Sequence, residues 1–186
     1  MKGFNRQDHS LSLCGLNCLL CPMHLRGYCP GCGKGDGNQS CVIAKCSIKH
    51  ENIEYCFLCS DYPCSHYHEI DNYDSFITHQ NQIVDNEKAR LIGLDKYREE
   101  QKNKQVFLLE LINEYNEGRK MTLYCQTVNL LPFDDLSTIM LELRLLTKKK
   151  QLNIKEKADI AERLFKECAK RNDINLKLRK KVSSSV

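Results

Sequence analysis

The sequence predicts a mainly α-helical protein, in which an irregular, cysteine-rich module of short strands and short helices precedes an α-helical bundle. Ten of the twelve cysteines lie between Cys14 and Cys64, together with three of the four prolines. After about residue 70, apolar residues recur with the 3.6-residue period of amphipathic helices. We expect a cysteine-rich module over residues 1–69, a helical domain over residues 70–176 and a basic, disordered tail over residues 177–186.

The cysteine-rich module has no sustained helical period and holds most of the glycine, so loops should predominate in it. Three pairs of its cysteines are separated by two residues. This spacing lets both sulfurs reach one ion while backbone amides donate hydrogen bonds to the thiolates. The spacing predicts a metal-stapled module whose ligands are the ten clustered cysteines: Cys14, Cys18, Cys21, Cys29, Cys32, Cys41, Cys46, Cys56, Cys59 and Cys64.

The strongest metal signal is the stretch C-P-G-C-G, residues 29–33. Pro30 fixes the entry to the turn, and Gly33 permits a positive φ after the second cysteine. Two cysteines outside the array, Cys125 and Cys168, are interpreted as buried structural thiols, because a lone thiol is usually a small apolar side chain.

Two zinc ions, each held by four thiolates, are the favoured cofactors, and such closed sites are structural rather than catalytic. Without metal, the module should lose its fold. A sequential division would give five cysteines to each half, Cys14–Cys32 and Cys41–Cys64, and an interleaved one is equally open. The histidines that can replace a sulfur are each favoured as solvated or capping residues: His24, His50, His66 and His68.

Iron–sulfur chemistry is the alternative. The C-x3-C-x2-C spacing of Cys14, Cys18 and Cys21 also occurs in radical S-adenosylmethionine enzymes, but those enzymes need a barrel of repeated strands and helices, which this helical pattern does not predict. An iron–sulfur electron carrier or accessory subunit stays open, because Cys-Pro dipeptides also recur around such clusters. The compact C-x2-C-x2-C run is absent, which favours zinc.

Three helices are predicted in the second part of the chain. The first lies between Asp95 and Asn116, with Gly118 as its stop signal. The second follows Pro132, and the third begins at Asn153, with Glu156 as its capping-box partner. Their apolar stripes should pack together. The run M-T-L-Y-C-Q-T-V-N-L-L between Gly118 and Pro132 is expected to be a short strand or an extended connector.

Lysine and arginine number 28 against 24 acidic residues, a formal net charge of +4, and residues 147–186 hold thirteen basic and five acidic groups. Two basic clusters could bind nucleic acid or an acidic partner: residues 148–150, which are all lysine, and Lys177, Arg179, Lys180 and Lys181. Solvated helix ends are the favoured interpretation. Two zinc ions with eight thiolates would add a charge of roughly −4, which argues against a strongly nucleic-acid-seeking protein.

The N-terminus lacks the apolar core of a secretory signal, and no stretch is long and apolar enough for a membrane span. We therefore expect a cytoplasmic protein with no membrane partner. In that reducing compartment, clustered cysteines indicate metal binding rather than disulfides.

The order of the cysteine motifs resembles that of a small prokaryotic cysteine-rich family called domain of unknown function 3795. In chain order the motifs are C-G-L-x-C-x2-C-P, a C-P-G-C knuckle, C-x4-C, C-x2-C and Y-P-C. The resemblance covers Cys14 to about Ile70 and, less specifically, Tyr124 to Pro132. It implies zinc binding by the ten clustered cysteines and no known reaction, and it leaves the basic extension after residue 147 open.

These observations together predict a structural zinc protein that acts as a protein-interaction or regulatory adaptor, with another protein as its partner and without catalytic activity. An enzymatic role would require an open ligand position, at which a zinc-bound water near His66, His68 or Glu69 could act as a nucleophile.

Overall fold

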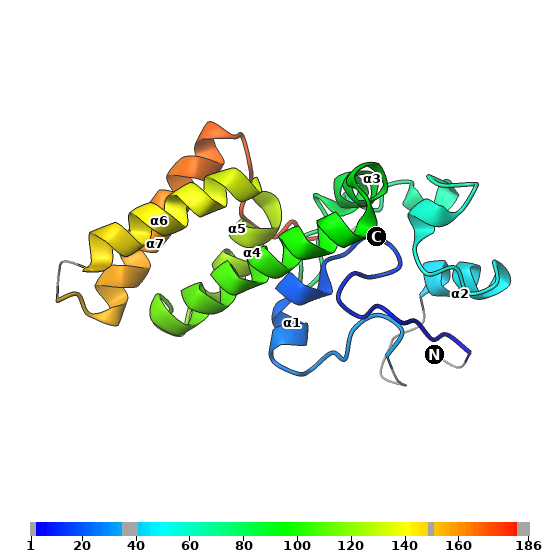
Figure 1. The fold of residues 1–186 in the computed structure, drawn as a ribbon, viewed down its shortest axis with the longest axis horizontal. Coiled ribbons are helices and arrows are strands. Elements are labelled where there is room, and N and C mark those ends of the chain that lie inside the picture. The colour runs from blue at the N-terminus through cyan, green and yellow to red at the C-terminus, as the bar shows by residue number, and fades with distance from the viewer. Residues whose placement is uncertain (1–2, 35–40, 149–150, 182–186) are drawn as a thin grey trace, which may run out of the picture. The chain divides into compact units, whose positions relative to one another are not determined.

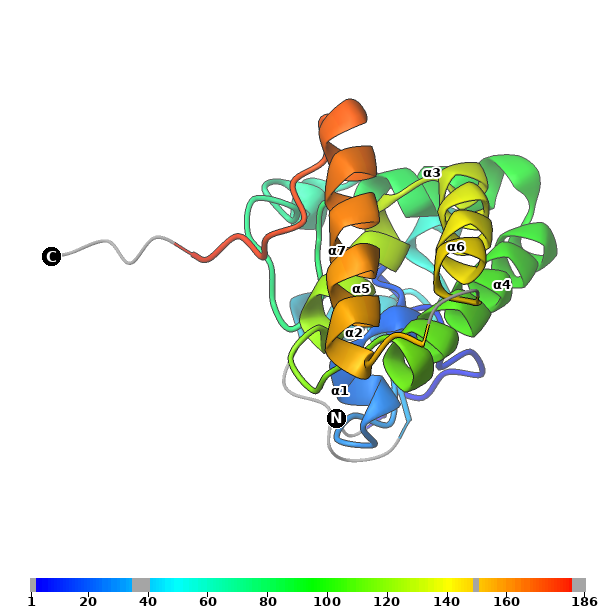
Figure 2. The ribbon, with the colours of Figure 1, turned by 90° about the vertical axis from the view of Figure 1, so that its left-hand side faces the viewer.

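The structure is a computed structural model that describes residues 3–34, 41–148 and 151–181. The chain forms two compact units: unit 1 comprises Met1–Glu99 and Leu178–Val186, and unit 2 comprises Glu100–Lys177. The ribbon in Figure 1 is mainly helical, as predicted. Figure 2 gives a second view of the same helices.

The helices differ sharply in length between the two parts of the chain. They are η1 (Cys18–Leu20), α1 (Pro22–Leu25), α2 (Val42–Lys49), η2 (Cys56–Leu58), η3 (Ser65–Tyr67), α3 (Gln82–Ile92), α4 (Leu94–Glu114), α5 (Met121–Leu130), α6 (Phe133–Lys148) and α7 (Ile154–Arg171). Among the described residues, β pairing is limited to an isolated bridge between Leu11 and Asn17. The cysteine-rich part therefore consists of loops and short helices, and this bridge is what it shows of the predicted short strands.

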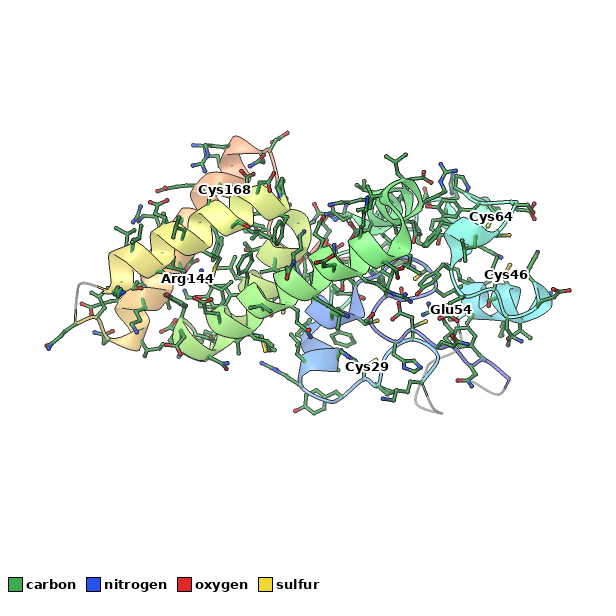
Figure 3. All side chains as sticks on the ribbon, in the orientation of Figure 1. Cys29, Cys46, Glu54, Cys64, Arg144 and Cys168 are labelled. Atoms are coloured by element: carbon green, nitrogen blue, oxygen red, sulfur yellow. The ribbon has the colours of Figure 1, made fainter. Side chains whose placement is uncertain are left out.

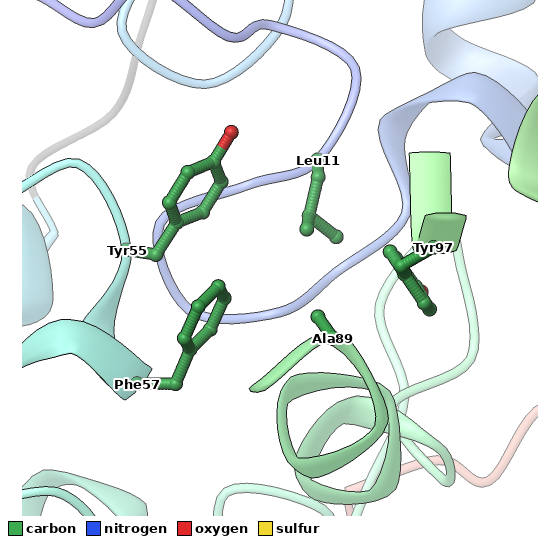
Figure 4. Close-up of a cluster of buried hydrophobic side chains, with 5 residues drawn as sticks. All are labelled: Leu11, Tyr55, Phe57, Ala89 and Tyr97. Atoms are coloured by element: carbon green, nitrogen blue, oxygen red, sulfur yellow. The ribbon is translucent and has the colours of Figure 1, made fainter. Parts of the chain in front are cut away.

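Two small apolar clusters lie among the described residues of unit 1. The first, drawn in Figure 4, consists of Leu11, Tyr55, Phe57, Ala89 and Tyr97. The rings of Tyr55 and Phe57 stack with centroids 5.1 Å apart. The second cluster consists of Phe4, Leu13, Ile43 and Ala44. Clusters of this size each bury little apolar surface.

A buried polar network braces the first cluster. Asp8 accepts hydrogen bonds from the Tyr55 hydroxyl at 2.5 Å and from Arg98 Nε at 3.1 Å. The guanidinium groups of Arg98 and Arg6 both lie over the Tyr55 ring, 5.9 and 5.1 Å from its centroid. Burial alone would raise the pKa of Asp8, but hydrogen bonds from Ser10, Tyr55 and Arg98 outweigh burial and hold this pKa well below its ordinary value.

Helix α3 packs against the loop that carries the first cysteine. The backbone carbonyl of Cys14 accepts hydrogen bonds from Gln82 Nε2 at 3.1 Å, Asn86 Nδ2 at 3.0 Å and the Tyr67 hydroxyl at 3.1 Å. Gly15 has φ +98°, and a Cβ there would lie 2.5 Å from the Gln82 carbonyl oxygen. Only glycine therefore allows the loop to approach α3 this closely.

The C-terminal segment is attached to unit 1 through Arg179. Its guanidinium donates to both carboxylate oxygens of Asp74, at 2.9 and 3.2 Å, and its backbone amide donates to the same carboxylate at 2.7 Å. The Lys181 ammonium lies 5.3 Å from the Tyr73 ring centroid. Residues 182–186 of the predicted disordered tail lie outside the described residues.

Unit 2 contains the three predicted helices, as the C-terminal half of α4, α6 and α7. The rings of Phe107 on α4 and Phe133 on α6 stack at 5.8 Å, and Glu110 pairs with Arg144 between the same helices. Helix α7 begins with the predicted capping box: Asn153 Oδ1 accepts from the amide of Glu156 at 3.0 Å, and the Glu156 carboxylate accepts from the Asn153 amide at 2.8 Å.

The prediction of a strand or extended connector between Gly118 and Pro132 is wrong, because Met121–Leu130 forms helix α5. Every residue from Tyr124 to Leu130 is buried. A helix covered on all sides lacks the polar face that produces an amphipathic period, so its sequence resembles that of a strand. No helix in the described part of the chain is long and apolar enough to cross a membrane.

Candidate metal centres

The ten clustered cysteines of unit 1 divide into two groups, each lining its own pocket. Four line a small pocket of about 30 Å³: Cys46, Cys56, Cys59 and Cys64. Six line a larger pocket of about 420 Å³: Cys14, Cys18, Cys21, Cys29, Cys32 and Cys41. Figure 3 shows Cys46 and Cys64 near each other and Cys29 well apart from both. Cys41 thus belongs with the earlier cysteines, giving six and four instead of the sequential five and five.

The four-thiol pocket is built from three short elements. Cys46 lies in α2, Cys56 begins η2 and Cys64 precedes η3. The single turn of η2 closes with a hydrogen bond of 2.9 Å from the Cys59 amide to the Cys56 carbonyl, which places these two cysteines at either end of one knuckle. His50 and His66 also line the pocket. Its volume suits a single ion.

Two thiols of this pocket, Cys46 and Cys56, have pKa values raised above the ordinary value. Burial, and then the neighbouring Cys64 and Cys59 thiols, raise the pKa of Cys46. Burial raises the pKa of Cys56 to about 12. A cation that displaces these protons would therefore relieve the mutual repulsion of the thiolates, and its binding would release protons.

The six-thiol pocket is larger and mostly apolar, with Phe4, Leu13 and Ile77 among its lining residues. Burial raises the pKa of Cys18 to about 12, and burial also raises the pKa of Cys14. The Ser12 hydroxyl lies 3.2 Å from the Cys14 sulfur, within hydrogen-bond distance. These thiols would bind metal as thiolates, releasing their protons to the solvent.

The knuckle at Cys29–Gly33 has the backbone that its sequence predicts. Gly33 has φ +86°, and a Cβ there would lie 2.8 Å from the Arg6 side chain. Gly31 has φ +101°. The positive φ predicted for Gly33 is thus confirmed, and the knuckle is pressed against the segment that carries Arg6.

The two pockets adjoin through the second apolar cluster. Ile43 lines both pockets, and the Cys56 amide donates to the Leu13 carbonyl at 2.9 Å. Cys14, Cys32 and Cys56 pack against this cluster. Metal at either pocket would therefore hold in place the side chains that wall the other.

Beside the four-thiol pocket, sequence reasoning missed Asp61 and did not favour His50 as a metal ligand. A ring nitrogen of His50, the Cys59 sulfur and a carboxylate oxygen of Asp61 all lie within 4.8 Å of one another. His50 was expected to be a solvated or capping residue, and it does cap α2. The sequence places Asp61 two residues after Cys59, but this spacing alone does not indicate a metal ligand.

The other histidines have different positions. His24 Nδ1 lies 3.0 Å from the Cys29 carbonyl oxygen, and His68 is exposed with Glu69 beside it. Cys125 and Cys168 are buried in unit 2, as predicted.

The basic residues of the C-terminal third are partly engaged in ion pairs. Lys166 pairs with Glu162, Arg163 pairs with Glu167, and Arg179 is held by Asp74. The lysines at 149 and 150 lie outside the described residues. Binding of nucleic acid by this region stays a prediction.

Comparison with protein-family models, with curated proteins and with solved structures finds no match to this chain. The resemblance to domain of unknown function 3795 therefore stays a prediction.

Proposed function

We propose that unit 1 is a zinc module in which the four-thiol and six-thiol pockets hold structural zinc. The observation that carries the proposal is the convergence of all ten clustered cysteines on two pockets that flank an apolar cluster of four residues. Thiolate sulfur is the usual donor of structural zinc sites, and zinc binding supplies folding free energy that so small a cluster does not.

Metal analysis of protein purified without added metal tests this proposal. We expect zinc, without acid-labile sulfide, in the wild-type protein. Cys64→Ser and Cys18→Ser, one from each pocket, should each lower the zinc content. Cys168→Ala in unit 2 is the matched control and should keep all of it. Zinc content that is unaffected by the two pocket variants would contradict the proposal.

An iron–sulfur cluster in the six-thiol pocket is the second candidate, and one observation favours it. The pocket volume of about 420 Å³ exceeds what a single tetrahedral ion fills. The six thiols are enough to supply the four ligands that one cluster takes. Iron and sulfide in anaerobically purified protein, lost in Cys18→Ser and retained in Cys64→Ser, would establish this candidate in place of zinc at that pocket.

We further propose that the protein acts as an adaptor for another protein. Supporting this role, unit 2 exposes large apolar side chains one turn apart on α6, Leu141 and Leu145, each 58% exposed. On α4 of the same unit, Val106 is 59% exposed. Exposed large apolar side chains one turn apart on a helix are typical of surfaces that bind other proteins. In this role the metal would keep unit 1 folded and perform no chemistry.

A further inference from the structure

We infer that His50, Cys59 and Asp61 form an additional, exchangeable site for a divalent ion at the rim of the four-thiol pocket. This inference rests on the proposed zinc module, since Cys59 belongs to both sets of ligands. It assigns a role to a histidine and a carboxylate outside the cysteine array.

The donor atoms are close enough for one ion. One ring nitrogen, one sulfur and one carboxylate oxygen lie within 4.8 Å of one another. Zinc bonds of about 2.0–2.3 Å place tetrahedral donors about 3–4 Å apart, a distance that small side-chain rotations can reach. Neutral imidazole, thiolate and carboxylate together carry a charge of about −2, which balances one divalent cation.

His50 is held in a state that suits a metal ligand. Its Nδ1 lies 2.9 Å from the Cys46 backbone carbonyl oxygen. Because a carbonyl only accepts hydrogen bonds, this contact places the proton on Nδ1 and leaves the lone pair on Nε2. A histidine that binds metal through one nitrogen commonly donates its other N–H to a backbone carbonyl. The contact with Cys46 thus orients the ring independently of Cys59 and Asp61.

Exposure distinguishes this site from the thiol pockets. His50 and Asp61 are exposed, whereas Cys59 is partly buried. Three protein donors leave a fourth position open to water, so the ion can leave without disturbing the apolar cluster. The Cys59 thiolate would bridge this ion and the ion of the four-thiol pocket. Unit 1 would then combine firmly held structural ions with one that exchanges with the surroundings.

Native mass spectrometry of the full chain, loaded with zinc and then treated briefly with a weak chelator, tests the inference. We expect the wild-type protein to lose one zinc ion rapidly and keep the others. His50→Ala and Asp61→Asn should each lack the rapidly lost ion, keep the firmly held ions and unfold at the wild-type temperature. His68→Ala, a change at an exposed histidine outside the set, should behave as wild type.

Two results would overturn the inference. If the wild-type protein keeps firmly bound zinc but loses no ion rapidly, the rim site does not exist and the zinc module stands. If both variants still lose one ion rapidly, the exchangeable ion lies elsewhere. A wild-type protein without any bound zinc would overturn the zinc module itself, and the rim site with it.

Discussion

Asp8 shows how single polar residues stabilise a unit with little apolar core. Its side chain is 7% exposed and pairs with Arg98 at 3.0 Å. It also accepts the Tyr55 hydroxyl proton, so one carboxylate joins an N-terminal loop, an aromatic cluster and helix α4. Both carboxylate oxygens of Asp8 accept hydrogen bonds, one from Tyr55 and Arg98 and the other from Ser10. Asparagine has one acceptor oxygen, so Asp8→Asn would leave donors on one side unsatisfied and would remove the ion pair with Arg98.

We predict that Asp8→Asn lowers the free energy of unfolding by about 1–3 kcal/mol, as measured by urea denaturation of the zinc-loaded protein. Asp95→Asn, which alters a fully exposed partner of the same Arg98, should leave stability unchanged.

Because the folded-state pKa of Asp8 lies below its ordinary value of 3.8, the contribution of Asp8 to the free energy of unfolding is present above that value and is lost as the pH falls through the folded-state pKa. The difference from wild type should therefore be the same at pH 7 and pH 5. A smaller difference at pH 5 would contradict the assignment.

Gly15 sets the distance between the first cysteine and helix α3. We predict that Gly15→Ala destabilises the protein by about 1–3 kcal/mol, because the methyl group would meet the Gln82 carbonyl at a residue with φ +98°. Gly27→Ala is the matched control: its φ is +74°, but nothing lies within 4 Å of the added carbon. The midpoint temperature of thermal unfolding should be lower for Gly15→Ala than for Gly27→Ala. Equal midpoints would show that the contact with α3 is not tight.

At this scale the sequence predicts local backbone well and distant partners poorly. The positive φ of Gly33 follows from its own place in a knuckle. The approach of Asp61 to His50 depends on where α2 and η2 lie in the folded unit, and no local pattern encodes that distance. The same holds for the grouping of Cys41 with Cys14, which spacing along the chain does not predict.

Among the elements, α7 has the clearest local start signal. Its capping box satisfies amides at the first turn of an 18-residue helix. We predict that Asn153→Ala lowers the free energy of unfolding by about 1 kcal/mol. Glu156→Gln should change it little, because a glutamine oxygen can accept the same amide. Thermal unfolding followed by circular dichroism checks both variants, and equal losses would show that the charge of Glu156, not the cap, stabilises the helix.

Helix α5 shows why element prediction fails inside a core. Its neighbours α6 and α7 carry one apolar stripe each, and their sequences predict them correctly. In α5 the polar residues Gln126, Thr127 and Asn129 are buried along with the apolar ones. The 3.6-residue period of apolar residues arises because a helix has one face toward the core and one toward the solvent. A helix that is buried on all faces does not show this period.

Across the whole molecule, the two units are stabilised differently. Unit 2 has long helices that bury large apolar side chains, including Leu108, Leu111 and Phe165. The described residues of unit 1 include two small apolar clusters and ten cysteines that form no disulfides. Metal removal should therefore affect unit 1 and spare unit 2.

The most direct test of the account is thiol alkylation during stepwise chelation of the zinc-loaded protein, with each modified cysteine identified by mass spectrometry. We predict that two sets become reactive as sets, the four cysteines of the small pocket and the six of the large one, while Cys125 and Cys168 stay protected. Release of all ten in a single step would contradict the two centres. Two sets divided between Cys32 and Cys41 would contradict the grouping of Cys41 with the earlier cysteines.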